Sequence, residues 1–241
     1  MARRPIIGVL LDYEAEGSFS KRPHYALRRG YFDAIWAAGG TPVAVPYIDD
    51  AAASYVGFCQ GFLFPGGTYP FPARLYGDAP IANEALHPRF QFEEQLMRQA
   101  VDQDLPVLGV CAGMQVMASL FGGTFYRNLK GTIDSAIDHL NERPAEQTAH
   151  GVEIVNGSRL HQVLGGTQFQ VNTAHNEALN NRPEGLVVNA IAEDGVIEGI
   201  EVPGKRFCLG VQWHPEFFAV EGDPNFNLFK ALVDAASRSN E

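Results

Sequence analysis

An apolar segment that ends at a cysteine between two glycines constrains the fold of this chain more than any other feature. The segment Leu105–Val110 is typical of a buried strand, Cys111 follows it, and a helical pattern covers Met114–Leu120. The small residues Gly109 and Gly113 relieve crowding where a strand turns sharply into a helix, as at a nucleophile elbow. We therefore predict that Cys111 lies at a helix N-terminus, where the helix dipole stabilises a thiolate. A small buried cysteine that ends a core strand is the alternative that this segment leaves open.

A second segment ends in an imidazole and a carboxylate. Residues 207–213 have an apolar strand pattern, and Pro215 keeps that strand from continuing past His214. A carboxylate at Glu216 that accepts from one ring nitrogen would fix the tautomer, which leaves the other nitrogen to take a thiol proton. A histidine beside a glutamate on the surface is the plainer interpretation. Together with Cys111, the pair predicts covalent catalysis on an amide.

Strand and helix patterns alternate along the first half of the chain, and shorter β-rich segments follow in the second half. Such alternation predicts an α/β fold in which helices cover both faces of a parallel sheet, with functional loops at the carboxyl ends of the strands. The expected strands are Ile6–Leu11, Pro42–Val45, Gly61–Phe64, Leu105–Val110, Val152–Val155, Phe169–Val171, Leu186–Ala192, Val196–Glu201 and 207–213, and the expected helices are Tyr25–Ala38, Asp50–Phe58, Phe92–Gln103, Met114–Leu120 and Pro224–Ser237.

Short motifs across nearly the whole chain resemble the class I glutamine amidotransferase superfamily, and within it the peptidase C26 family of γ-glutamyl-γ-aminobutyrate hydrolases. That resemblance implies a single domain over residues 1–241. It also implies a flavodoxin-like three-layer sandwich with a central, mostly parallel sheet and a small antiparallel β extension. The motifs are Ile6–Val9, Phe64–Gly67, Pro72–Gly77, Gly109–Gln115, Gly122–Thr124, Val171–His175, Asp194–Glu201 and Gly210–Glu216.

The resemblance also implies roles for individual residues. Cys111 would be the nucleophile, His214 the general base and then the acid, and Glu216 the partner that orients the imidazole. The backbone N–H groups of Gly67 and Ala112 would form the oxyanion hole, which requires close approach rather than a particular side chain.

Substrate contacts follow from the same resemblance. Gln115 matches the position that helps to hold the glutamyl head group, and His175 and Asn176 match the segment that contacts its α-amino and α-carboxylate ends. Many members of the hydrolase branch carry Arg where this chain has Ala112, and His-His-Gln where it has His-Asn-Glu ending at Glu177. These departures leave hydrolysis in place and favour a different, positively charged leaving amine as a hypothesis.

Composition narrows the partners and the compartment. A net charge of −10 over 241 residues argues against nucleic acid and against an anionic membrane surface. The expected partner is a small γ-glutamyl molecule, with a homodimer allowed. The three cysteines and the absence of a secretory signal pattern indicate a reducing, cytoplasmic setting in which Cys59 and Cys208 are core thiols. Neither His-x-x-x-His nor Cys-x-x-Cys spacing occurs, so we expect no metal, and catalysis would need no cofactor.

The mechanism expected from these features is attack of Cys111 on a γ-glutamyl amide and hydrolysis of the resulting thioester. Two alternatives stay open: a glutaminase subunit that delivers ammonia to a partner synthase, and a non-catalytic binding module of the same fold. Residues 68–88, rich in proline and aromatic side chains beside Gly67, are expected to form a lid or an amine pocket. Residues 129–149 are polar, and surface decoration is the simpler interpretation for them.

Overall fold

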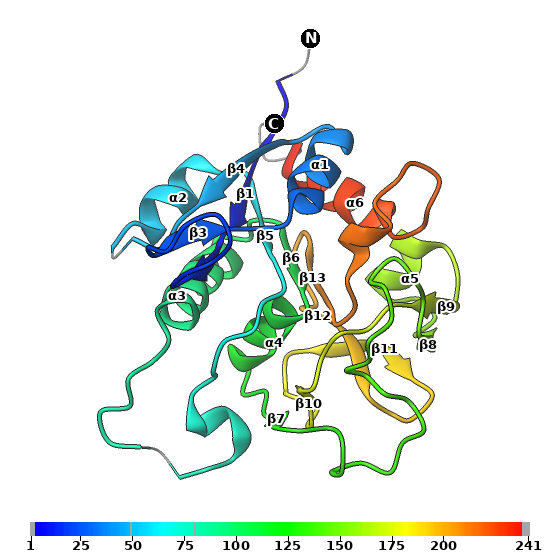
Figure 1. Cartoon of the computed structure of the whole chain (residues 1–241). Coiled ribbons are helices and arrows are strands. Elements are labelled where there is room, and N and C mark those ends of the chain that lie inside the picture. Colours follow the sequence, from blue (N-terminus) through cyan, green and yellow to red (C-terminus); the bar gives the residue numbers. More distant parts are fainter. Residues whose placement is uncertain (1–2, 49, 80, 238–241) are drawn as a thin grey trace.

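A computed structural model describes residues 3–48, 50–79 and 81–237 of the chain. Its centre is a nine-stranded sheet with strand order β4-β1-β5-β6-β13-β12-β11-β8-β9 (Figure 1). In that order the strands are Thr41–Val45, Ile6–Leu10, Gly61–Phe64, Val107–Val110, Cys208–Val211, Ile197–Glu201, Val187–Ala192, His150–Ile154 and Gln168–Val171.

The sheet has a parallel part and an antiparallel part. Strands β4, β1, β5, β6 and β13 pair in parallel, and β12, β11, β8 and β9 continue from β13 in antiparallel pairs. The antiparallel strands are the extension that the sequence predicted, and they belong to the same sheet as the parallel strands. The predicted α/β class with a mostly parallel central sheet is therefore confirmed.

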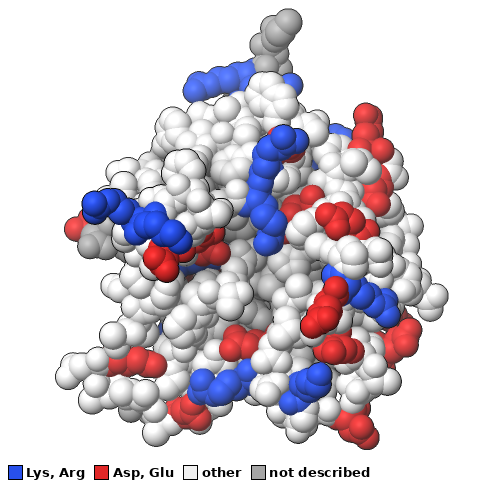
Figure 2. All heavy atoms as spheres, in the orientation of Figure 1, with Lys and Arg blue, Asp and Glu red and all other residues white. Residues whose placement is uncertain are grey.

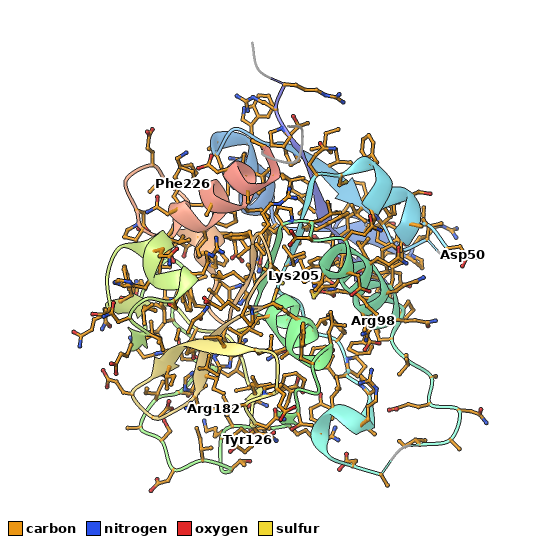
Figure 3. All side chains as sticks on the ribbon, turned by 180° about the vertical axis from the view of Figure 1, so that it is seen from behind. Asp50, Arg98, Tyr126, Arg182, Lys205 and Phe226 are labelled. Atoms are coloured by element: carbon orange, nitrogen blue, oxygen red, sulfur yellow. The ribbon has the colours of Figure 1, made fainter. Side chains whose placement is uncertain are left out.

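Helices cover both faces of the sheet, which gives three layers. Strand β5 shows why, since Leu63 packs into one hydrophobic core while Phe62 and Phe64 pack into the other. In the view from behind, Phe226 at the start of α6 and Asp50 just before α2 lie on opposite sides of the molecule (Figure 3). One layer contains α1 (Arg29–Ala37), α5 (Arg159–Leu164) and α6 (Phe226–Ser237), and the other contains α2 (Ala52–Phe58), α3 (Pro88–Asp102) and α4 (Ala112–Ser119).

Some element boundaries differ from those predicted. Helix α1 begins at Arg29 rather than at Tyr25, because Tyr25 belongs to β3 (His24–Ala26), which pairs with β2 (Asp12–Glu14). Helix α3 begins at Pro88 rather than at residue 92. The His87 side chain accepts a hydrogen bond from the Arg89 amide, and proline suits the first helical position because it needs no N–H acceptor. Residues 159–164 form α5, a helix that the sequence pattern did not indicate.

Several short elements complete the fold. Segment 68–88 contains a 3-10 turn, η1 (Ala73–Tyr76), and a second such turn, η2 (Pro215–Phe217), follows β13. Strands β7 (Phe125–Tyr126) and β10 (Ala178–Leu179) form a separate pair. Basic and acidic side chains are interspersed over the face seen in Figure 2. Within the described ranges, no helix is both long enough and apolar enough to cross a membrane.

Candidate active site

Three neighbouring parallel strands end at the same edge of the sheet and place the candidate catalytic residues there. Cys111 follows β6, His214 follows β13, and Gly66 and Gly67 follow β5. Strands β6 and β13 are paired in register through Val110 and Val211. Because carboxyl ends of adjacent parallel strands meet at one edge, these loops converge where open α/β sheets bind their ligands.

Cys111 occupies a strained turn between β6 and α4. Its backbone angles are φ 51° and ψ −107°, a positive φ that residues with a side chain rarely adopt. The Cys111 amide donates to the Val211 carbonyl at 2.8 Å, which ties the turn to β13. A Cβ atom added at Gly113 would lie 2.2 Å from the Phe64 carbonyl oxygen, and one at Gly109 would lie 2.7 Å from the Gly113 carbonyl oxygen. The elbow predicted from sequence is therefore present, and its close contacts require both glycines.

His214 and Glu216 form a hydrogen-bonded pair behind the elbow. Nδ1 of His214 lies 2.9 Å from Oε1 of Glu216, and both residues are buried. The His214 amide donates to Oδ1 of Asn172 at 2.9 Å, and Nδ2 of Asn172 donates to the His214 carbonyl at 3.1 Å. The carboxylate therefore fixes the proton on Nδ1, and the backbone clamp fixes the ring, which leaves Nε2 to face another group.

The thiol and the imidazole approach each other around Gly66. A Cβ atom placed on Gly66 would lie 2.6 Å from Cε1 of His214 and 3.4 Å from Cβ of Cys111. Burial by itself would lower the pKa of His214, but negative charge on Cys111 and on Glu216 outweighs burial and raises that pKa to about 10. At neutral pH the ring is therefore an imidazolium that is able to give its proton to a leaving group.

Arg28 is a functional neighbour that sequence reasoning missed. It directly precedes α1, and its Nη2 donates to Oε1 of Glu216 at 2.8 Å and to the Tyr31 hydroxyl at 3.1 Å. Burial raises the pKa of Glu216, but the hydrogen bond from His214 and the charges of His214 and Arg28 outweigh it and lower that pKa. Arg28 stands in no motif, and only its position in the fold brings it to the site.

A cavity of about 320 Å³ opens in front of Cys111. It brings together four residues predicted from sequence to surround the substrate. Gly67 comes from the loop after β5, Gln115 from α4, and His175 and Asn176 from the loop after β9. The cavity is lined by Gly67, Thr68, Tyr69, Phe71, Cys111, Gln115, Leu140, Ala174, His175, Asn176 and Glu177.

The two amides expected to hold an oxyanion flank the nucleophile. Ala112 is the first residue of α4, so its N–H has no acceptor within the helix. Gly67 lies against the buried guanidinium of Arg89, and a Cβ atom there would be 2.0 Å from Nη1 of Arg89. Arg89 donates to the carbonyls of Pro65 and Gly66 at 2.5 and 3.2 Å, which fixes the loop after β5. Close packing at this loop therefore accounts for the glycine.

Gln115 binds the neighbouring loop with its amide nitrogen. Nε2 donates to the Glu177 carbonyl at 3.0 Å and to Oε1 of Gln212 at 3.2 Å, so its amide oxygen is the polar atom left for a ligand. The Tyr76 hydroxyl, from η1, donates to Oε1 of Glu177 at 2.6 Å. Segment 68–88 therefore contacts the pocket through Tyr76 as well as through the residues next to Gly67.

Two solved structures share this fold. A GMP synthase protein of Thermoplasma acidophilum superposes with a TM-score of 0.66 at 16% identity, covering 99% of this chain and 96% of its own. The glutaminase domain of Trypanosoma brucei CTPS superposes with a TM-score of 0.65 at 19% identity, covering 97% and 94%. The fold therefore defines a protein of the glutamine amidotransferase type.

Sequence comparisons define the family. The chain matches the family model described as Peptidase C26 over residues 5–216, and it belongs to the peptidase C26 family. A glutamine amidotransferase-like protein of Rickettsia prowazekii is 31% identical over 98% of this chain and 99% of its own length. The γ-glutamyl-γ-aminobutyrate hydrolase PuuD of Escherichia coli K12 is 27% identical over 96% of this chain and 93% of its own. The family resemblance read from the motifs is thus confirmed.

Proposed function

We propose that the protein hydrolyses a γ-glutamyl amide, with Cys111 as the nucleophile. The observation that carries this proposal is the strained elbow, which presents Cys111 to a cavity while the bonded pair of His214 and Glu216 lies behind it. An activated nucleophile needs a base held by a third group, and these three residues have that arrangement. The peptidase C26 family is consistent with a hydrolase.

The reaction follows from the geometry in two halves. The Cys111 sulfur attacks the γ-carbonyl carbon, and the amides of Gly67 and Ala112 hold the negative oxygen of the tetrahedral intermediate. The imidazolium of His214 then protonates the departing amine, which leaves a γ-glutamyl thioester on the sulfur. The neutral ring next takes a proton from water, whose oxygen attacks the thioester and releases glutamate and the free thiolate.

The substrate class comes from the size and lining of the cavity. The amide oxygen of Gln115 and the polar atoms of His175 and Asn176 offer partners for the charged α-groups of a glutamyl head. A second cavity of about 410 Å³ also includes Leu140, His175 and Asn176 in its lining. We place the amine half of the substrate toward this second cavity, as in γ-glutamyl-γ-aminobutyrate or a related γ-glutamyl amine. PuuD of Escherichia coli, which carries the name of that hydrolase, supports this choice.

A glutaminase that delivers ammonia to a partner synthase is the second candidate. It is favoured by the name of the Rickettsia prowazekii relative, glutamine amidotransferase-like, and by the structural likeness to a CTPS glutaminase domain. A non-catalytic binding module would keep the fold without using the thiol.

Glutamate release from a substrate panel separates these candidates. The panel contains γ-glutamyl-γ-aminobutyrate, γ-glutamyl-putrescine, γ-glutamyl-alkylamides and glutamine, with Cys111→Ala as the control. Release from one γ-glutamyl amine that depends on Cys111 supports the hydrolase. Release from glutamine alone supports the glutaminase of an amidotransferase, and no release from any of the four supports the binding module.

A further inference from the structure

Four buried side chains converge beside the candidate active site and take no part in the proposed reaction. Their exposed fractions are 3% for His139, 5% for His150, 4% for His175 and 0% for Glu198. His150 begins β8 and Glu198 lies in β12, whereas His139 and His175 come from the two loops that border the cavities. The sheet and both loops therefore meet at one point.

One carboxylate oxygen lies at the centre of this cluster. Oε1 of Glu198 is 3.4 Å from Nδ1 of His139, 3.6 Å from Nε2 of His150 and 3.3 Å from Nε2 of His175. These three nitrogens and both Glu198 oxygens are buried and make no hydrogen bond to any described residue. Buried polar atoms without partners are costly, so something must compensate them.

The far nitrogen of each ring shows which charge is missing. Each of those nitrogens is bonded to an oxygen acceptor, so each carries the proton of a neutral imidazole. The nitrogen that faces Glu198 then has only a lone pair. The acceptors are Oδ2 of Asp194 for His139 at 2.9 Å, the Gly151 carbonyl for His150 at 3.1 Å and the Glu177 carbonyl for His175 at 3.0 Å.

We propose that a divalent transition metal ion of the zinc class binds between His139, His150, His175 and Glu198. Three imidazole lone pairs and a carboxylate form a donor set that zinc prefers. Donors about 2.0–2.1 Å from a tetrahedral ion lie about 3.3 Å apart, and the nitrogens lie 3.3–3.6 Å from the Glu198 oxygen. One ligand atom from each of His139, His150 and Glu198 lies within 4.8 Å of the other two, and His175 supplies the fourth donor.

The surroundings match a metal site better than a set of shared protons. Histidine ligands of metals donate their other N–H to a carboxylate or a backbone carbonyl, and all three rings do so here. The Ser135 hydroxyl in turn donates to the Asp194 carboxylate at 2.5 Å. If the rings were imidazolium ions instead, positive charges would be buried with the ring centres of His139 and His150 only 4.9 Å apart.

The metal would fix the wall of the substrate pocket. All four donors come from the protein, which is typical of a closed, structural site rather than of a catalytic one. The ion would join β8 and β12 to the loop that contains His139 and to the pocket loop that contains His175. This inference departs from the absence of metal expected from sequence, because the ligands are too far apart along the chain to form a short motif.

Metal content of the purified protein tests the proposal directly. Protein grown with added zinc and purified without chelators should contain about one zinc ion per chain by elemental analysis. Glu198→Gln and His150→Ala should lose at least nine-tenths of that zinc. The matched control His161→Ala, at a histidine in α5 outside the cluster, should keep it. Cys111→Ala should keep it as well, which separates this site from metal bound by the active-site thiol.

Cobalt provides a second measurement on the folded wild-type chain. After removal of zinc by a chelator, Co²⁺ should bind at one equivalent with the intense visible bands of a tetrahedral site. A folded wild-type protein that holds no metal and takes up neither Zn²⁺ nor Co²⁺ at one equivalent would overturn the proposal. Zinc that stays in Glu198→Gln, or that leaves with Cys111→Ala, would also overturn it. These readouts do not depend on glutamate release, so failure of the proposed function would leave them unaffected.

Discussion

Oε1 of Glu216 accepts hydrogen bonds from both Nδ1 of His214 at 2.9 Å and Nη2 of Arg28 at 2.8 Å. One carboxylate oxygen therefore holds the catalytic imidazole and an arginine from a different part of the chain. This shared acceptor fixes the orientation of the ring, and the negative charge of Glu216 favours the imidazolium form. The pH dependence of the reaction and the role of Arg28 follow from it.

The alkaline limit of activity should report the protonation of His214. The pKa of His214 is raised to about 10, so the imidazolium persists at neutral pH and is lost as the pH rises through that value. We expect kcat/KM to fall above about pH 10. Glu216→Gln removes a negative charge that raises the pKa, so this limit should move to lower pH, and kcat/KM at pH 7 should fall roughly 10²-fold. An unchanged alkaline limit in Glu216→Gln would contradict this account.

Arg28→Gln should slow the chemical step more than it weakens substrate binding. The change removes a donor to Glu216, and a less firmly held carboxylate orients His214 less well. We expect kcat to fall about tenfold with little change in KM, because Arg28 does not line the cavity in front of Cys111. The neighbouring Arg29→Gln is the matched control, since Arg29 is exposed and pairs only with Asp33 among the described contacts. Equal losses in the two variants would refute the positioning role.

Gly113→Ala should destabilise the elbow. The new methyl group would lie 2.2 Å from the Phe64 carbonyl, and overpacking of this kind typically costs about 1–3 kcal/mol. Gly57→Ala is the control, because this glycine lies in α2 with open space around it and alanine is favoured there by about 0.5–1 kcal/mol. Chemical denaturation of both variants gives the two free energies of unfolding, and a loss for Gly113→Ala no greater than that for Gly57→Ala would contradict the predicted clash.

Glu177 should influence which amine leaves. Its carboxyl group lies in the cavity lining and accepts from Tyr76, and burial raises its pKa. We expect Glu177→Gln to lower kcat/KM for γ-glutamyl-putrescine about tenfold relative to γ-glutamyl-γ-aminobutyrate, because a carboxylate attracts only the cationic amine. Measuring both substrates with both proteins checks this, and the same ratio before and after the change would show that Glu177 does not select the amine.

The sequence predicted those parts of the fold and site that depend on local patterns. Strand β5 has the predicted bounds because Gly61–Phe64 is a short apolar run between breaks. The elbow at Cys111 was predictable because its glycines and its strand-to-helix change lie within a few residues. Helix α1 starts later than predicted because Tyr25 pairs with Tyr13 in a tertiary contact that periodicity does not reveal.

Other features depend on residues that are distant in sequence. Arg28 reaches Glu216 from 188 positions away, and Arg89 reaches the Pro65 carbonyl from the opposite end of a loop. The His139, His150, His175 and Glu198 cluster combines two loops with two strands, so only the assembled fold brings it together. The spacing rules that identify metal motifs apply to ligands within a few residues of one another, and this cluster lies beyond their reach.

The acyl-enzyme on Cys111 tests the central claim most directly. Wild-type protein is mixed with excess γ-glutamyl-γ-aminobutyrate, quenched with acid during turnover and digested, and the peptide that contains Cys111 is weighed by mass spectrometry. The account predicts an added γ-glutamyl group on that peptide, removable by neutral hydroxylamine as expected of a thioester, and neither adduct nor glutamate release in Cys111→Ala. Glutamate release that continues in Cys111→Ala, with no adduct on the wild-type peptide, would contradict it.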